Sequence, residues 1–295
     1  MATAGLLLLT LSGYTNVLSR ETAVACLCGD NSVAPRLFWS ADGLRLYRCR
    51  QCGLVWLGQE ALPDIHGLYT ANYFGSYYQQ SRGIRRNFFD SWLRAWGRPP
   101  GRLLDVGCGI GIFLEAATAQ GWVVAGVEPS DGAEPFRDRR FDVFRGTLES
   151  APFAAHSFDL VTFWDVLAHL PDPLSSLRRA RELLKPDGWL VVKTANRANL
   201  HLAIAKALSP LGGTRGWLHL PAQLYQFSPH SLGALVEHAD FRVTEVIALD
   251  EPMRPRFADL LAKPKALAER VLQLLIRLNG LRESFVLTAI AQHGP

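Results

Sequence analysis

The chain lacks a concentrated basic segment. Its 295 residues carry a formal net charge of +4, from 31 lysines and arginines against 27 aspartates and glutamates. Nucleic-acid-binding domains usually gather their basic residues on one face. The charge of this chain therefore does not indicate a nucleic-acid partner.

A convincing export signal is also missing. Residues Leu6–Leu9 and Leu11 are apolar, but the run is short and no lysine or arginine precedes it. We therefore expect a cytoplasmic protein, in which a disulfide framework is disfavoured because it needs an oxidising compartment. With 48% hydrophobic residues, the chain can bury one sizeable core and carry a small additional module.

Glycines dominate one expected turn between a strand and a helix. Residues Leu103–Leu114 read LLDVGCGIGIFL, and the spacing of Gly107, Gly109 and Gly111 lets the backbone approach a ligand closely. A dinucleotide fingerprint would carry its third glycine one position later. Asp105, just before the turn, would repel a pyrophosphate but attract the cationic amine of a methionine group. The acid therefore favours S-adenosylmethionine over a dinucleotide.

A second acid follows the next apolar run. Trp122–Val127 is expected to form a buried strand ending on Glu128, where a carboxylate can accept hydrogen bonds from ribose hydroxyls. Short apolar runs then alternate with helical stretches, which is typical of a parallel sheet covered on both faces. We expect strands at 141–144, 158–163, 189–193, 241–249 and 284–291, a helix at 173–184, a turn at 185–188, and a helix after its N-cap Ser228.

The order of these motifs resembles that of class I S-adenosylmethionine-dependent methyltransferases, over about residues 99–250. The shared features are DVGCGIG at the turn, EPS after the second strand and DVLAHLPDP after the fourth. The resemblance implies an α/β fold with a Rossmann-like, seven-stranded, mostly parallel sheet whose last strand is antiparallel. In this family the loop after the third strand lines the adenine, which here implies Leu148 with Glu149, and the family often has an aspartate where this chain has Thr147. The resemblance implies these cofactor-binding residues: Asp105, Gly107, Gly109, Gly111, Glu128, Leu148, Glu149 and Trp164.

Four of the five cysteines form two close pairs, which predict one tetrahedral, structural zinc site. The predicted ligands are Cys26, Cys28, Cys49 and Cys52. The Cys-x-Cys spacing of the first pair is one residue shorter than usual, and free thiols are the alternative. Residues 36–39 and 44–48, between the pairs, are expected to form the hairpin of a zinc ribbon. Cys108 is interpreted as a small buried residue rather than a nucleophile.

The segment after the second cysteine pair resembles the amino-terminal part of many bacterial methyltransferases of this group. There, Cys-Gly-Leu-Val is followed by a tyrosine-rich stretch, which matches residues 52–55 and then Tyr69, Tyr73, Phe74, Tyr77 and Tyr78. The resemblance implies that this stretch and the following helix fold over the cofactor as a lid. The alternative is that the aromatic residues pack the ribbon onto the core.

A general base is needed only if the methyl acceptor is an alcohol, a phenol or an acidic carbon. His169 is the candidate, since it follows the fourth strand at the ligand edge of the sheet and titrates near neutral pH; a packing role is the alternative. Related ubiquinone-type O-methyltransferases place two acids and this histidine in the loop, a cluster able to bind a divalent cation. Here the three positions hold Asp165, Ala168 and His169, and the missing carboxylate argues against a metal-assisted mechanism.

We expect an extension at 1–20, a zinc-ribbon-like module at 21–58, an aromatic linker and lid helix at 59–98, and a methyltransferase domain at 99–295 with helical insertions at 199–227 and 255–282. Substrate selection is expected in the first insertion, which contains the helix-like Leu200–Leu208. The amphipathic segment 256–281 is expected to cover the core, with a dimer face or a membrane-surface contact as alternatives.

Three functional hypotheses follow. The first is a methyltransferase that acts on a small molecule or on a glycan- or lipid-linked precursor, by O- or C-methylation. The second is an rRNA or tRNA methyltransferase, although the ribbon is not richly basic and the loop after the fourth strand lacks an Asn-Pro-Pro-Tyr signature. The third is a non-catalytic module that binds S-adenosylmethionine. The oligomeric state is not predicted.

Overall fold

The computed structural model describes residues 26, 34–41, 43–58, 69–197, 207, 218–249 and 284–291. Within this part of the chain, seven strands form the central sheet in the order β10-β11-β8-β7-β4-β5-β6. Strands β8, β7, β4, β5 and β6 pair in parallel, whereas β11 is antiparallel to both of its neighbours. The predicted mostly parallel sheet with an antiparallel last strand is confirmed. The strands are β4 (Arg102–Val106), β5 (Val123–Val127), β6 (Asp142–Phe144), β7 (Phe158–Trp164), β8 (Leu184–Ala195), β10 (Phe241–Leu249) and β11 (Ser284–Ala291).

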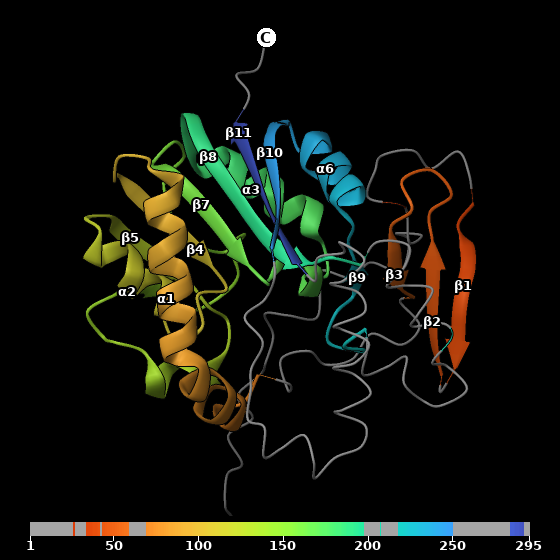
Figure 1. Ribbon diagram of the computed structural model, residues 1–295, viewed down its shortest axis with the longest axis horizontal. Coiled ribbons are helices and arrows are strands. Elements are labelled where there is room, and N and C mark those ends of the chain that lie inside the picture. Colours follow the sequence, from red (N-terminus) through yellow and green to blue (C-terminus); the bar gives the residue numbers. More distant parts are fainter. Residues whose placement is uncertain are drawn as a thin grey trace, which may run out of the picture.

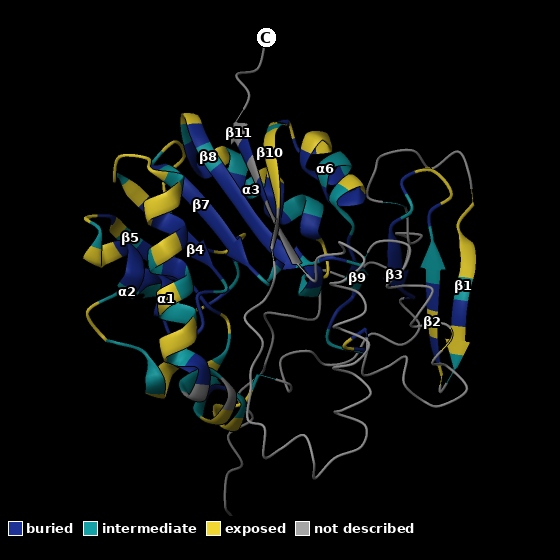
Figure 2. Ribbon diagram, in the orientation of Figure 1, coloured by how far each residue is buried: buried dark blue, intermediate teal, exposed yellow. Residues whose placement is uncertain are grey.

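Helices cover both faces of the sheet (Figure 1). Helices α1 (Gln79–Trp96) and α2 (Ile112–Ala119) pack on one face, and α3 (Pro173–Leu183) and α6 (Pro229–His238) pack on the other. The central strands are buried along most of their length (Figure 2). Such double coverage explains why these strands are nearly continuous apolar runs rather than alternating ones.

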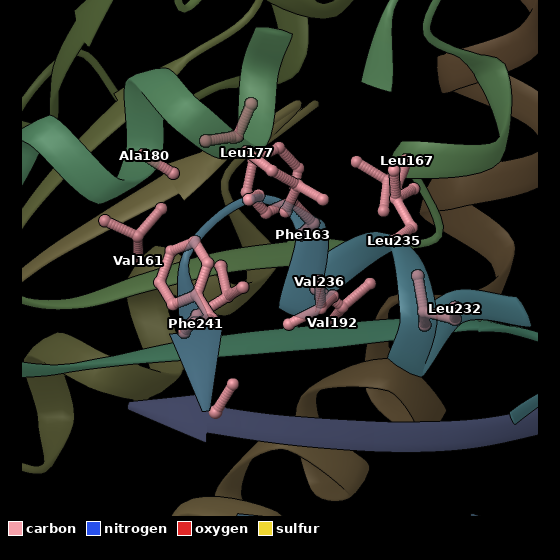
Figure 3. Packing of buried hydrophobic residues seen from close by; sticks show 14 of the residues in the cluster. Val161, Phe163, Leu167, Leu177, Ala180, Val192, Leu232, Leu235, Val236 and Phe241 are labelled. Atoms are coloured by element: carbon pink, nitrogen blue, oxygen red, sulfur yellow. The ribbon is translucent and has the colours of Figure 1, made fainter. Parts of the chain in front are cut away.

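Alternate side chains of β7 enter the two cores. Leu160 belongs to the cluster under α1 and α2, whereas Val161 and Phe163 belong to the cluster under α3 and α6. In Figure 3, Phe163 lies near Leu177 of α3, and Val161 lies near Ala180 of α3 and Phe241. The sheet is thus fixed from both faces, and its carboxyl-terminal edge is held in a defined position.

The predicted helix starts are confirmed by their caps. The side chain of Asp172 accepts a hydrogen bond from the Ser175 N–H at 2.9 Å, at the start of α3. Ser228 forms a capping box with Ser231 at the start of α6, and Pro229 follows as the first helical residue. The bounds predicted for the last two strands, β10 and β11, are also confirmed.

The turn predicted at 185–188 forms a bulge inside β8. The pairing with β7 passes from Phe158↔Leu184 directly to Leu160↔Trp189, so the four predicted turn residues lie opposite Asp159 alone. The ammonium group of Lys185 donates to both carboxylate oxygens of Asp159, at 2.9 and 2.8 Å. Asp187 has a φ of 61°, so the backbone turns locally within these residues, and the ion pair ties them to the neighbouring strand.

A second, four-stranded sheet holds the ribbon. Strands β1 (Arg36–Ala41), β2 (Leu44–Arg48) and β3 (Val55–Leu57) are antiparallel neighbours, which confirms the predicted hairpin. The last strand of this sheet is β9 (Tyr225–Gln226), which comes from the first predicted insertion and pairs with β3. The Leu57 N–H donates to the Leu224 carbonyl, and the Leu224 N–H donates to the Ala168 carbonyl, both at 2.8 Å. Main-chain hydrogen bonds therefore connect the ribbon to the loop after β7.

Several predicted features lie outside the described residues. They are the extension at 1–20, Cys28, the segment 256–281, and the helix-like Leu200–Leu208 apart from Ala207. Among the helices that the structure does describe, none combines the length and the apolar character needed to cross a membrane.

Candidate active site

The glycine turn joins β4 to α2 at the point where several strand ends meet. Gly107, Gly109 and Gly111 have positive φ angles of 69°, 53° and 82°. The Gly107 N–H donates to the carbonyl of Val127, at the end of β5, at 2.7 Å. A Cβ at position 107 would lie 2.4 Å from Cγ2 of Val166, in the loop after β7. Position 107 therefore requires glycine, and its backbone is the surface that a ligand would meet.

Asp105 is a buried acid just before the turn. Its side chain is 3% exposed, and the Thr162 hydroxyl on the neighbouring strand donates to Oδ1 at 2.7 Å. Burial raises the pKa of Asp105 to about 8; the Thr162 hydrogen bond opposes this shift and the charge of Glu128 adds to it. A cationic group placed beside Asp105 would favour its ionised form. The site therefore suits the amine of a methionine group.

Glu128 follows β5 and connects two loops. Its Oε2 accepts from the Gly109 N–H and its Oε1 accepts from the Ser130 N–H, both at 2.9 Å. These hydrogen bonds fix the carboxylate at the end of the strand, and Glu128 is only 7% exposed. The predicted contact with ribose hydroxyls remains a prediction, and it is compatible with a carboxylate held at the edge of the sheet.

The two residues predicted to line the adenine make other contacts in this structure. Leu148 is 2% exposed and belongs to the core under α3 and α6. Glu149 accepts a hydrogen bond from the Ser176 hydroxyl of α3 at 2.5 Å. In the same loop, the Thr147 N–H donates to the Ser150 hydroxyl at 3.2 Å. The role of Leu148 and Glu149 in binding the cofactor remains a prediction.

Trp164, the last residue of β7, packs into an aromatic cluster under α1. Its ring centroid lies 5.1 Å from that of Phe89, 4.9 Å from that of Trp92 and 5.1 Å from that of Phe113. Its buried indole N–H has no hydrogen-bond partner among the residues that the structure describes. These contacts give Trp164 a packing role, and its predicted contact with the cofactor remains a prediction.

An aromatic segment, residues 69–78, crosses the glycine turn; we call it the strap. It ends in the π-helix η3 (Tyr73–Tyr78). An added Cβ at Gly109 would lie 3.3 Å from Cε1 of Phe74 and 3.8 Å from Cε1 of Tyr78, so both rings lie against the turn. Phe74 is also 3% exposed and part of the core under α1. The strap therefore covers the turn and packs onto the core at the same time.

His169 lies in the short helix η5 (Leu167–His169), in the loop after β7. Its Nδ1 is 2.8 Å from the carbonyl oxygen of Ala222 and 2.9 Å from the hydroxyl oxygen of Tyr69. Because a carbonyl can only accept, Nδ1 carries the proton and Nε2 keeps its basic lone pair. Burial lowers the pKa of His169, although the Ala222 hydrogen bond and Asp165 oppose this shift.

Asp165, in the same loop, is paired with a buried lysine of β8. Lys193 Nζ lies 2.6 Å from Asp165 Oδ2, and the Asp165 N–H donates to the Lys193 carbonyl at 2.9 Å. Asp165 has a φ of 60°, an uncommon conformation for a residue other than glycine. The sequence offered one signal for this pair, a lysine at the edge of an apolar strand, but Lys193 and the Tyr69 contact with His169 were not predicted.

Three of the four predicted zinc ligands lie together. The thiols of Cys26, Cys49 and Cys52 are all within 4.8 Å of one another, and the Sγ atoms of Cys26 and Cys52 are 3.3 Å apart. The N–H groups of Gln51 and Cys52 point at Cys49 Sγ, at 3.3 and 3.4 Å. Zinc–sulfur bonds of about 2.3 Å in a tetrahedron place sulfurs about 3.8 Å apart. The three thiols therefore fit a zinc site.

Cys108, inside the glycine turn, is buried, and burial raises the pKa of its thiol well above the usual range. A raised pKa keeps the thiol protonated and unreactive. The interpretation of Cys108 as a small buried residue agrees with this position.

The glycine turn lies in a segment that is similar to known proteins. Residues 78–246 match the model of a family described as "Methyltransferase domain". A ubiquinone biosynthesis O-methyltransferase of Stutzerimonas stutzeri is 30% identical over 180 residues, covering 56% of this chain and 74% of the relative. The enzyme of the same name from Nitrosospira multiformis is 29% identical over 178 residues, covering 56% of this chain and 72% of the relative.

Solved structures share the fold. An S-adenosylmethionine-dependent methyltransferase from Thermotoga maritima has a TM-score of 0.53 at 18% identity, covering 77% of this chain and 100% of that chain. One from Archaeoglobus fulgidus has a TM-score of 0.50 at 18% identity, covering 73% of this chain and 99% of that chain. The family match spans more than half of the chain and includes the glycine turn, Asp105 and Glu128. The chain therefore belongs to the class I S-adenosylmethionine-dependent methyltransferases.

Proposed function

We propose that this methyltransferase transfers a methyl group to a hydroxyl oxygen of a small molecule or of a glycan- or lipid-linked precursor. The observation that carries the proposal is the orientation of His169. Its Nδ1–H is held by the Ala222 carbonyl at 2.8 Å, which leaves Nε2 as a base. Val166, in the same loop, lies against Gly107, so the base belongs to the loop that borders the turn. The relatives named ubiquinone biosynthesis O-methyltransferase support oxygen as the acceptor atom, with an acidic carbon as the alternative.

The cofactor, when bound, supplies the methyl group from a sulfonium and would leave as the neutral thioether S-adenosylhomocysteine, while the protein aligns the acceptor with the methyl group. In the proposed arrangement, Asp105 binds the methionine amine and Glu128 binds the ribose. The turn from Gly107 to Gly111 gives the backbone close approach. Leu148 and Glu149, in the loop after β6, and Trp164, at the end of β7, complete the predicted cofactor-binding set.

His169 would act on the acceptor. As the acceptor oxygen gains the methyl group, its proton passes to Nε2, and the Ala222 carbonyl stabilises the resulting imidazolium through Nδ1–H. Because burial lowers the pKa of His169, the ring is neutral and able to accept this proton at neutral pH.

We also propose that transfer needs no divalent cation in the loop after β7. Asp165 is already paired with the ammonium group of Lys193, at 2.6 Å, and Ala168 offers no carboxylate. A metal ion would have to compete with this lysine for a single acid. The loop therefore supports acid–base chemistry by His169 rather than metal-assisted deprotonation.

We further propose that Cys26, Cys49 and Cys52 bind a structural zinc ion with Cys28 as the fourth ligand. The clustering of the three thiols supports this proposal. Four thiolates would leave no open coordination position, so the ion would stabilise the ribbon and take no part in transfer. Paired cysteines used as metal ligands also fit the expected cytoplasmic location and the expected module at 21–58.

A His169→Gln variant tests the proposed function. Full-length protein is assayed with methyl-labelled S-adenosylmethionine and with catechol and protocatechuic acid as hydroxyl acceptors. We expect kcat to fall by about 100-fold or more, as for loss of a general base, with unchanged binding of S-adenosylhomocysteine. His230→Gln is the matched control, because His230 is exposed on α6. Wild-type kcat in His169→Gln, or methylation of RNA and of neither phenol, would contradict the proposal.

A further inference from the structure

Three segments that are distant in sequence meet at Nδ1 of His169. The loop after β7 supplies the ring, the segment before β9 supplies the Ala222 carbonyl, and the strap supplies the Tyr69 hydroxyl, 100 residues away in the chain. The rings of Tyr69 and His169 also contact edge to face, with centroids 6.2 Å apart. The environment of this histidine is therefore completed by the strap.

The Tyr69 hydroxyl has a defined role in this arrangement. Nδ1 carries a proton for the Ala222 carbonyl, so the Tyr69 oxygen, at 2.9 Å, accepts from the same N–H. Burial raises the pKa of Tyr69, and the nearby Tyr73 and Glu128 add to the shift, so the hydroxyl stays neutral. Two acceptors on one side of the ring fix its plane and keep Nε2 on the other side.

The strap is tied to the loops that flank the glycine turn. The Ser130 hydroxyl, two residues after Glu128, donates to the Tyr69 carbonyl at 2.5 Å. A Cβ at Gly132 would lie 2.4 Å from the carbonyl carbon of Thr70, so only glycine lets the strap lie this close. Phe74 lies directly over Gly109. One short segment thus contacts the cofactor-binding turn and the base together.

We propose that Tyr69 is a positioning residue for His169, and that through Tyr69 the strap couples cofactor binding at the glycine turn to the orientation of the base. The inference rests on the proposed function, in which His169 is that base. A ligand at the turn would fix Phe74, and with it the strap and the Tyr69 hydroxyl. Cofactor binding would then reinforce the orientation of the base, so that the acceptor reacts after the cofactor has bound.

The test follows the His169 ring by NMR. Full-length protein is labelled with 15N-histidine, and the His169 signals, among those of eight histidines, are assigned by their loss in His169→Gln. Signals are recorded over a pH series without and with S-adenosylhomocysteine. The titration of His169 also senses the charged and titratable groups that face its ring, which are Asp165 from its own loop and Tyr69 from the strap.

We expect wild-type His169 to be the Nδ1–H tautomer and to change its chemical shifts and its titration midpoint when S-adenosylhomocysteine binds. In Tyr69→Phe, S-adenosylhomocysteine should still bind, but the response of His169 should be lost. kcat for catechol should fall about three- to tenfold, the effect of one hydrogen bond, while KM changes little. The matched control is Tyr225→Phe, whose hydroxyl donates to the Pro171 carbonyl at 3.1 Å and not to His169; the response should persist there.

A full response of His169 and a wild-type kcat in Tyr69→Phe would overturn the inference, and so would an equal loss of the response in Tyr225→Phe. Failure of the proposed function has a different signature. In that case His169→Gln would transfer methyl groups at the wild-type rate, whatever the spectra of Tyr69→Phe show.

Discussion

Replacing Asp105 by asparagine should make the ligand-free protein more stable. The carboxyl group is buried between β4 and β7, and burial raises its pKa to about 8 from the ordinary value of 3.8. Asparagine has nearly the same shape and keeps an oxygen that can accept from the Thr162 hydroxyl, 2.7 Å away in the wild type. The substitution therefore removes a buried titratable group with little change in packing.

The size of the effect follows from the two pKa values. Because the folded chain binds this proton more tightly than the unfolded chain, the contribution of Asp105 to stability falls as pH rises between the unfolded and the folded pKa. At pH 7 the unfolded aspartate is ionised while the folded one is mostly protonated. This difference disfavours folding by about 4 kcal/mol at pH 7 and by about 2 kcal/mol at pH 5. Asp105→Asn should recover these amounts.

Urea denaturation of ligand-free protein at pH 5 and pH 7 measures the effect. Asp159→Asn is a control for which we expect the opposite change in stability. Partial burial raises the pKa of Asp159, but hydrogen bonds from the Arg102 N–H and the Lys185 ammonium outweigh this and lower the pKa below its ordinary value. Its loss should therefore destabilise the protein. If Asp105→Asn destabilised the protein at both pH values, or gained no more at pH 7 than at pH 5, the reasoning would be refuted.

Three further predictions concern other parts of the fold. Purified protein should contain about one zinc per chain, which Cys49→Ser should lose in metal analysis; a metal-free protein that is fully folded would contradict this. Gly126→Ala should cost about 1 to 3 kcal/mol in urea denaturation, because a Cβ there would lie 2.7 Å from Cys108 Sγ; a second change, Cys108→Ala, should recover part of the loss, and no recovery would contradict the stated cause. Added Mg²⁺ should leave the transfer rate unchanged, because Lys193 already pairs with Asp165; a rate that depends on Mg²⁺ would show that the pair opens for a metal.

Local chemistry made much of the fold predictable. The glycine turn, the cap at Ser228 and the last two strands depend on neighbouring residues or on apolar runs, and the structure confirms them. The turn at 185–188 lies where it was predicted, but that it forms a bulge inside β8 was not predicted, because a tertiary contact accompanies it. Its lysine pairs with Asp159 on the adjacent strand, and no local pattern reports which acid lies opposite.

The candidate site was predictable only in part, for the same reason. Asp105, Glu128 and His169 lie at strand ends, and the carboxyl ends of parallel strands meet at one edge. Their partners come from distant segments: Tyr69 and Ala222 reach His169 only because the strap and the β9 segment fold over that edge. Strand β9 is two residues long, too short to leave a periodic pattern.

The most direct test of the account is isothermal titration of S-adenosylhomocysteine into wild-type protein, Gly109→Val and Gly233→Val. A side chain at Gly109 would enter the turn beside Phe74, at a φ of 53°, whereas a Cβ at Gly233 would meet nothing within 4 Å. We predict binding to the wild type and to Gly233→Val, and none to Gly109→Val while it remains folded. Equal binding to all three proteins would contradict the assignment of the cofactor to this turn.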